Sequence, residues 1–354
     1  MRLHLNTVSI RIRLHLNTVS IVSTIVIKKN MSEISVSHFA TPGPTHSNSR
    51  RPIVAITGAA GQLGTALQCD SFAADVEVLA LTRAQLDITD SAAVEATPLL
   101  DDVDIIINAA AATDVDGAES DPGSAHLINA LGPKCLAARA KKEGAYLIHI
   151  STDYVFGDVA IDEMTGQRRA LRVDDFTAPQ TMYGRTKLVG ENNVRDSGAR
   201  FAILRTAWVW SGPTQPEAKD FVSTMMRLAE TATDDKGNPA IIKVVDDQHG
   251  NPTFVGDLAG AIWELSERVL SEPSSAPTGT FHVTGSGEAT WFEVAREVFR
   301  LTGHDPQRVA ACTSSEFPRP APRPAWSVLD GSAWSEVGLH ALPEWQDTLR
   351  AVLT

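Results

Sequence analysis

The feature that most restricts the fold is a glycine-rich turn after the first apolar run of the organised chain. Residues 53–70 combine an apolar run typical of a strand (IVAIT), the turn GAAGQLG and a stretch typical of a helix. Gly58 permits a tight turn, Gly61 lets the backbone approach a pyrophosphate, and Gly64 lets the helix pack close to the strand. The helix N-terminus then offers unpaired N–H groups to phosphates. By itself this spacing also fits a glycine turn in other α/β proteins.

Strands and helices alternate after this turn. Continuous apolar strands separated by helices indicate a parallel sheet covered on both faces. The predicted fold class is therefore α/β, a Rossmann-like doubly wound parallel sheet over residues 51–205. Residues 206–354, where the rhythm weakens, are expected to form a smaller α/β substrate lobe that is partly interleaved with the sheet. The pattern predicts strands at 77–81, 104–108, 146–150 and 243–247, and helices at 124–142, 183–191, 221–230, 257–270 and 290–301.

The first fifty residues differ from the rest of the chain. The nine letters RLHLNTVSI occur at 2–10 and again at 13–21, but two copies cannot build a repeat fold. Residues 32–50, rich in Ser, Thr and Pro, predict disorder. We therefore expect 1–50 to be a disordered or non-native extension, with Met31 as a candidate start and a presequence as the alternative.

Charge and cysteine content exclude some classes of function. The net charge of −12 speaks against nucleic acid or an anionic membrane as the main partner, because phosphates need a basic surface. The three cysteines lie far apart and form no metal-binding spacing. A reducing, cytoplasmic setting is the expectation.

Several residues after the glycine turn are candidates for cofactor contact. Arg83 follows the second strand, where an arginine can meet a 2′-phosphate, so NADPH is preferred over NADH. The alternative is an exposed arginine with no such role. Asp87 and Ile88 suit a loop over the adenine, and the run of alanines at 109–112 leaves room for a cofactor against the backbone.

The candidate chemistry follows the fourth strand. Thr152 and Asp153 fall at its carboxyl end, where doubly wound sheets bind ligands. Tyr183 and Lys187 are four residues apart on a predicted helix and share one face. A nearby ammonium lowers the pKa of a phenol, so this pair is expected to move a proton beside a hydride transfer.

A proline-rich stretch near the C-terminus, residues 318–324, is expected to run as an extended loop. It carries Arg319 and Arg323, which are candidates for a diphosphate because a guanidinium fork matches phosphate oxygens. A solvated loop without ligand is an equal alternative.

Together these motifs resemble the extended short-chain dehydrogenase/reductases, and in finer detail their dTDP-4-dehydrorhamnose reductase branch. The resemblance runs from about Pro52 to the C-terminus. It rests on GAAGQLG (58–64), INAAAATDVDGAE (107–119), HISTDYVFGD (149–158), TAPQTMYGRTKLVGE (177–191), LRTAWVWSG (204–212), VVDDQHGNPTFVGDLA (244–259) and RPAPRPAWSVLD (319–330).

The resemblance implies reduction of the 4-keto group of dTDP-4-dehydro-L-rhamnose by NAD(P)H in a monomer or homodimer. It implies that Tyr183 donates the proton, that Lys187 holds the nicotinamide ribose, and that Thr152 orients the carbonyl. The implied cofactor contacts are Gly58, Gly61, Gln62, Leu63, Gly64, Arg83, Asp87, Ile88, Ala111, Ala112, Thr113, Tyr183 and Lys187, and the implied substrate contacts are Thr152, Asp153, Val115 and Trp208.

This chain also departs from the branch pattern. Residues 157–179 are longer than expected, and Gln180-Thr181 and Asp220-Phe221 replace the usual Leu-Asn and Asn-Phe. Ala66 stands where some relatives place a metal-binding glutamate, so no metal is predicted.

Two alternatives remain, one from another class of protein and one from the same extended family of enzymes. One is a non-catalytic subunit of the same fold, similar to the regulatory subunit of methionine adenosyltransferase. The other is a nucleotide-sugar epimerase or dehydratase, although Tyr154 stands after Asp153 where a dehydratase usually has Glu.

Overall fold

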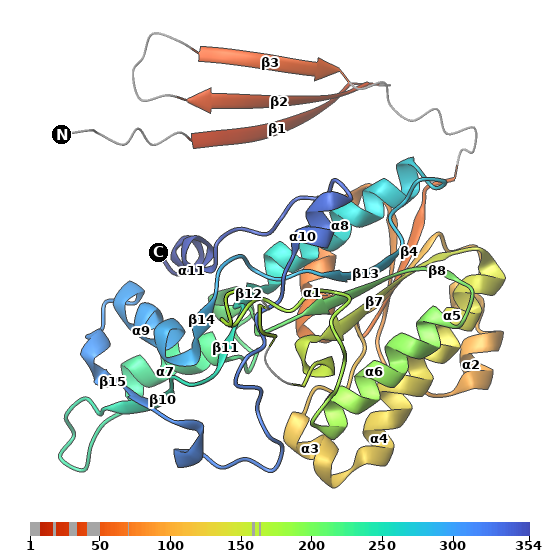
Figure 1. Cartoon of the computed structure of the whole chain (residues 1–354). Coiled ribbons are helices and arrows are strands. Elements are labelled where there is room, and N and C mark those ends of the chain that lie inside the picture. Colours follow the sequence, from red (N-terminus) through yellow and green to blue (C-terminus); the bar gives the residue numbers. More distant parts are fainter. Residues whose placement is uncertain are drawn as a thin grey trace. The chain divides into compact units, whose positions relative to one another are not determined.

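Six parallel strands form the central sheet of the computed structural model, in the order β13-β8-β7-β6-β4-β5 (Figure 1). The chain moves outward from β4 to β5 and then returns to the other side of β4 for β6, so the strand order reverses between β4 and β6. Ligands of such sheets bind beyond the carboxyl ends of the strands at this reversal. The predicted fold class is confirmed. The strands are β4 (Ile53–Thr57), β5 (Glu77–Leu81), β6 (Ile105–Asn108), β7 (Tyr146–Thr152), β8 (Arg200–Thr206) and β13 (Gly279–His282).

The structure describes residues 8–16, 19–27, 34–40, 50–69, 71–157, 160–162 and 164–354. The chain divides into two compact units, Met1–Arg50 and Arg51–Thr354. The two lobes expected at 51–205 and 206–354 both fall inside the second unit. They share the sheet, because β13 comes from the second half and pairs with β8.

Helices cover both faces of the sheet (Figure 1). On one face, α1 (Gln62–Cys69) and α8 (Val255–Ser271) pack together, and the Trp263 indole N–H donates to the Leu67 carbonyl at 3.0 Å. The opposite face is covered by α2 (Ser91–Ala96), α5 (Gly132–Glu143) and α6 (Met182–Arg195).

The helix predicted over 124–142 is interrupted. It consists of α4 (Pro122–His126), a π-helical turn at Leu127–Leu131, and α5. Pro133 lacks the N–H that would bond the carbonyl of Asn129, which explains why regular α-helical bonding breaks there. A Cβ at Gly190 would lie 2.1 Å from that carbonyl oxygen, so α6 packs directly against the break.

The second half adds a smaller layer with its own apolar core. Two short strands, β10 and β15, pair in parallel, and α7 and α9 pack beside them. No helix in the described ranges is long and apolar enough to cross a bilayer. The remaining elements are α3 (Val115–Ser120), β9 (Val209–Trp210), α7 (Phe221–Thr231), β10 (Ile242–Val245), β11 (His249–Gly250), β12 (Thr253–Phe254), β14 (Ala289–Thr290), α9 (Trp291–Leu301), β15 (Val309–Cys312), α10 (Ser332–Glu336) and α11 (Trp345–Leu353).

The first unit contains a three-stranded antiparallel sheet of β1 (Val8–Leu16), β2 (Val19–Ile27) and β3 (Ile34–Ala40). Residues 34–40 of the predicted lead-in are described as strand β3, and the expectation that 1–50 is a disordered or non-native extension stays a prediction. The sequence of these strands is rich in the β-branched residues Val, Ile and Thr, which favour extended backbone. Met31 and the rest of the predicted lead-in up to residue 49 lie outside the described residues.

Candidate active site

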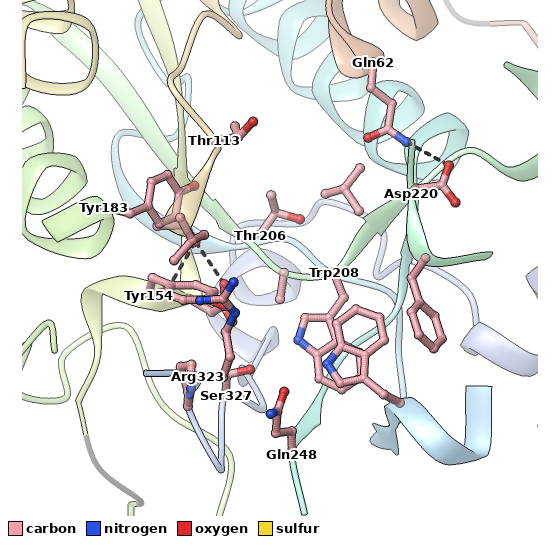
Figure 2. A pocket seen from close by; sticks show the side chains of 18 of the residues that line it. Gln62, Thr113, Tyr154, Tyr183, Thr206, Trp208, Asp220, Gln248, Arg323 and Ser327 are labelled. Atoms are coloured by element: carbon pink, nitrogen blue, oxygen red, sulfur yellow. Dashed lines mark hydrogen bonds between the residues drawn. The ribbon is translucent and has the colours of Figure 1, made fainter. Parts of the chain in front are cut away.

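The carboxyl ends of the central strands open into a cavity of about 750 Å³ (Figure 2). Cavities of roughly 300–1,000 Å³ are typical of small-molecule sites. Its wall combines the glycine turn, the ends of β6, β7 and β8, and segments of the second half. The candidate contact residues from the sequence that line it include Gly61, Gln62, Leu63, Ala111, Thr113, Val115, Thr152, Asp153, Tyr183, Lys187, Trp208, Arg319 and Arg323.

Six predicted cofactor contacts do not line this cavity: Gly58, Gly64, Arg83, Asp87, Ile88 and Ala112. Ile88 is buried against Gly132, and the backbone N–H of Ala112 donates to the side chain of Asn129 at 2.9 Å. The Arg83 side chain is 77% exposed and its Nε lies 3.1 Å from Asp87 Oδ2. Their cofactor roles stay predictions.

Two of these glycines shape the turn itself. Gly58 has φ +73°, and a Cβ there would lie 2.6 Å from the backbone nitrogen of Ala110. A Cβ at Gly64 would lie 2.3 Å from the carbonyl oxygen of Gly58. Neither position therefore accepts a side chain unless the backbone moves.

Tyr183 and Lys187 lie on the first turns of α6, where both are buried. The helix begins here because the Thr181 hydroxyl accepts a hydrogen bond from the backbone N–H of Gly184 at 3.0 Å. Lys187 Nζ donates to the carbonyl oxygen of Ile150 at 2.7 Å, which fixes the ammonium at the edge of β7. Burial lowers the pKa of Lys187 to about 8, although the charge of Glu191 opposes the shift.

The expected lowering of the Tyr183 pKa is wrong for this structure. Burial raises the pKa of Tyr183 to about 12, and a hydrogen bond with Thr152 offsets only part of the rise. The loss of water around the phenol therefore outweighs any stabilisation of the phenolate. A phenol with this pKa stays protonated near neutral pH and can serve as a proton donor.

Thr152 and Asp153 line the cavity beside Tyr183. The Thr152 hydroxyl donates to Asp153 Oδ1 at 2.9 Å and accepts from the backbone N–H of Tyr154 at 3.2 Å. Burial raises the pKa of Asp153 to about 6, so its carboxyl group titrates just below neutral pH.

Two stacked tryptophans, Trp208 and Trp291, line the same cavity, and only Trp208 was predicted from the sequence. Trp208 has an unusual φ of +48°, and its ring stacks on Trp291 with a centroid distance of 3.6 Å and an angle of 8°. Phe221 packs against Trp291 at 4.5 Å. Trp291 was missed because it is the first residue of an amphipathic helix and there resembles an ordinary core residue.

A polar cluster joins the glycine turn to the second half. Gln62 Nε2 donates to Ser211 Oγ at 3.0 Å. It also donates to Asp220 Oδ2 at 3.3 Å (Figure 2). Asp220 also caps α7 by accepting from the backbone N–H of Ser223 at 2.8 Å. Asparagine also offers a side-chain oxygen for such a cap, so the departure noted at this position keeps the local structure.

The two arginines of the proline-rich stretch line the cavity but differ in how closely they approach the Asp116 carboxylate. Arg323 binds the carboxylate of Asp116 with both Nη atoms, at 3.0 and 2.8 Å. Arg319 approaches the same carboxylate only to 3.9 Å. Among the described residues, no group of three or more His, Cys, Asp or Glu side chains is arranged to hold a metal ion.

The sheet order, the glycine turn and the cavity at the strand ends define a Rossmann-fold protein built around a nucleotide-sized site. The chain belongs to the family described as the RmlD substrate binding domain, whose model matches residues 52–354. The resemblance inferred from the motifs is thereby confirmed.

Named relatives agree with this assignment. The dTDP-4-dehydrorhamnose reductase of Mycolicibacterium smegmatis is 42% identical over 313 residues, which cover 87% of this chain and 88% of that protein. A probable dTDP-4,6-dihydroxy-2-methyloxan-3-one 4-ketoreductase of Streptomyces antibioticus is 40% identical over 83% of this chain and 92% of its own length. The crystal structure of dTDP-4-dehydrorhamnose reductase from Bacillus anthracis in complex with NADP has a TM-score of 0.75 and 31% identity, covering 86% of this chain and 99% of that one.

Proposed function

We propose that this protein reduces the 4-keto group of dTDP-4-dehydro-L-rhamnose to dTDP-L-rhamnose with a hydride from NAD(P)H. The observation that carries the proposal is that Tyr183, Lys187 and Thr152 line the same cavity as Gly61 of the glycine turn. The names of the relatives in Mycolicibacterium smegmatis and Bacillus anthracis support the substrate and the cofactor.

The residues at the glycine turn fit a dinucleotide. A Cβ at Gly58 or Gly64 would meet backbone atoms within 3 Å, so the turn is compact, and Gly61 presents bare backbone to the cavity. The backbone of Gly61, Gln62 and Leu63 would hold the pyrophosphate, and Ala111 and Thr113 would line the cofactor at the end of β6. When bound, NAD(P)H supplies the hydride.

Tyr183 would provide the proton that the reduced C4 oxygen requires. Its pKa of about 12 keeps the phenol protonated at neutral pH. Its hydrogen bond with Thr152 supports a joint role in which both hydroxyl groups would contact the carbonyl oxygen of the substrate. Lys187, with a pKa of about 8, is largely an ammonium at neutral pH. Its positive charge favours the phenolate that remains after proton transfer.

The direct test is an assay that follows NADPH oxidation with dTDP-4-dehydro-L-rhamnose. Wild-type protein should turn over, and Tyr183→Phe should lose about 100-fold or more of kcat because general acid catalysis contributes roughly 10²–10⁴-fold. The Kd of the variant for NADPH should change far less than kcat, because Tyr183→Phe removes only the hydroxyl group. If wild type binds NADPH but converts no 4-keto sugar nucleotide, the protein is instead a binding subunit of the same fold.

A chemically related substrate, another dTDP-linked keto sugar, is the second candidate. The Streptomyces antibioticus relative is named for a different dTDP-linked keto sugar at nearly the same identity. The assay therefore includes that keto sugar, and the larger kcat/KM identifies the substrate.

We also propose a cytoplasmic setting, since Cys69, Cys135 and Cys312 are free thiols.

A further inference from the structure

One carboxylate holds the proline-rich segment, defined here as residues 317–324 (FPRPAPRP), against the first half of the chain. Asp116 Oδ1 accepts from the backbone N–H of Ala321 at 3.1 Å and from Arg323 Nη1 at 3.0 Å. Asp116 Oδ2 accepts from Arg323 Nη2 at 2.8 Å. Planar, two-point pairing of this kind fixes orientation as well as distance.

The composition of the segment explains why such a tether is needed. Four of its eight residues are prolines, which lack a backbone N–H and cannot join a strand ladder. The backbone N–H of Ala321 lies between two prolines and bonds to Asp116. Arg323 Nη1 also donates to the Ala321 carbonyl at 3.0 Å, so the guanidinium braces the segment from within.

The tether joins two segments that contribute residues to the cavity wall. Asp116 belongs to α3, which begins directly after the loop that places Thr113 in the cavity wall. Phe317, Arg319 and Arg323 of the proline-rich segment line the same cavity. Figure 2 shows Arg323 in the same part of the cavity as Tyr154 and Tyr183.

The two arginines of the segment are in different states. The Arg323 side chain is 22% exposed and directs both Nη atoms at the carboxylate. The Arg319 side chain is 62% exposed and remains 3.9 Å from the same carboxylate, so water and ligands still reach it. Fully paired Arg323 is suited to hold the wall, and loosely paired Arg319 is suited to meet an anion.

We propose that Asp116 is a positioning residue that, through Arg323, fixes the proline-rich segment as the wall against which the sugar nucleotide binds, and that Arg319 contacts its diphosphate. This inference rests on the proposed function for the identity of the ligand. It predicts that loss of the Asp116 charge weakens sugar-nucleotide binding and leaves NADPH binding intact.

The test uses two variants that break the tether, Asp116→Asn and Arg323→Gln, and the double variant that combines them. Arg319→Gln tests the diphosphate contact. The control is Asp347→Asn, which removes the charge from an exposed pair with Arg350. Three quantities are measured: the KM values for sugar nucleotide and NADPH with kcat, the Kd for thymidine 5′-diphosphate, and hydrogen exchange in a peptide covering residues 318–327. The Kd and the exchange rates do not require turnover, so a wild type without activity counts against the proposed function alone.

For Asp116→Asn we expect about a tenfold rise in the sugar-nucleotide KM and in the thymidine 5′-diphosphate Kd, with the NADPH KM within twofold. Hydrogen exchange in the 318–327 peptide should become about tenfold faster. The double variant Asp116→Asn with Arg323→Gln should bind thymidine 5′-diphosphate no more weakly than either single variant, because each substitution breaks the same tether. Arg319→Gln should weaken diphosphate binding without changing exchange, and Asp347→Asn should change nothing.

Two results would overturn the inference. One is an Asp116→Asn protein with wild-type exchange and wild-type affinity for thymidine 5′-diphosphate. The other is a rise of the NADPH KM as large as that of the sugar nucleotide, since this would indicate general loosening of the fold.

Discussion

Glu191 and Arg205 form a two-point ion pair inside the protein, with Oε1 2.9 Å from Nε and Oε2 2.8 Å from Nη2. Both side chains are buried. Glu191 lies one helical turn after Lys187 on α6, and Arg205 lies near the end of β8. The pair therefore clamps the helix that carries Tyr183 and Lys187 onto the edge of the sheet where the cavity opens.

Removing one charge of this pair should destabilise the fold strongly. Glu191→Gln leaves the Arg205 guanidinium buried without its counter-charge, which typically costs about 3–5 kcal/mol in the free energy of unfolding. Urea denaturation measures the loss. The matched control is Asp347→Asn, whose exposed pair with Arg350 is worth at most about 1 kcal/mol. Equal effects of the two substitutions would contradict a stabilising role for the buried pair.

The same pair predicts how stability responds to acid. Burial alone would raise the pKa of Glu191, but the Arg205 guanidinium, together with the Ser151 hydroxyl and the charge of Arg195, outweighs it and lowers the pKa from its ordinary 4.5 to about 2. A carboxyl group with a lowered pKa stabilises the fold above pH 4.5 and loses that contribution as the pH falls towards 2. Urea titrations between pH 6 and about pH 3 should therefore show a steeper loss in wild type than in Glu191→Gln.

The rate of reduction should fall on the alkaline side at the pKa of Lys187. Its ammonium is charged below about pH 8 and neutral above, whereas Tyr183, with a pKa of about 12, keeps its proton throughout this range. We expect kcat to decrease above about pH 8 with the loss of one proton. In Lys187→Arg the descending limb should vanish, because arginine stays charged. A wild-type rate that stays flat to pH 10 would argue against the need for this charge.

Alanine substitutions at two glycines of the turn should have different effects, one on the stability of the fold and the other on cofactor binding. A Cβ at Gly64 would lie 2.3 Å from the Gly58 carbonyl oxygen, whereas one at Gly61 would lie 3.2 Å from it. Gly64→Ala should therefore destabilise the protein by about 1–3 kcal/mol, the usual range for overpacking. Gly61→Ala should unfold near the wild-type temperature but raise the NADPH Kd, since Gly61 lines the cavity. Thermal unfolding measures the loss of stability in Gly64→Ala, and fluorescence titration with NADPH measures the rise of the Kd in Gly61→Ala.

The preference for NADPH is predicted to depend on Arg83. Arg83→Ala should raise the KM for NADPH about tenfold and that for NADH less than twofold, since a guanidinium recognises the 2′-phosphate through two hydrogen bonds. In this structure Arg83 is paired with Asp87 on the surface, so a bound 2′-phosphate would compete with that carboxylate. Equal changes for both cofactors would remove the proposed role.

Features with a local signal were predictable from the sequence. The strand at Ile53–Thr57 and the positions of Tyr183 and Lys187 follow from apolar runs, glycine spacing and helical spacing over a few residues. The tether between Asp116 and Arg323 joins residues 207 positions apart, and neither residue carries a pattern that points to the other. The direction of the Tyr183 pKa shift was missed because burial of the phenol depends on packing that spacing does not reveal.

The origin of β13 in the second half of the chain has a consequence for biosynthesis. The sheet cannot be completed until the ribosome has made residues 207–278, because the partner strand for β8 emerges only afterwards. Until then β8 presents an open row of N–H and C=O groups, which is a template for pairing with other chains. Truncations that end near residue 206 should for this reason accumulate as aggregates rather than as a soluble cofactor-binding fragment.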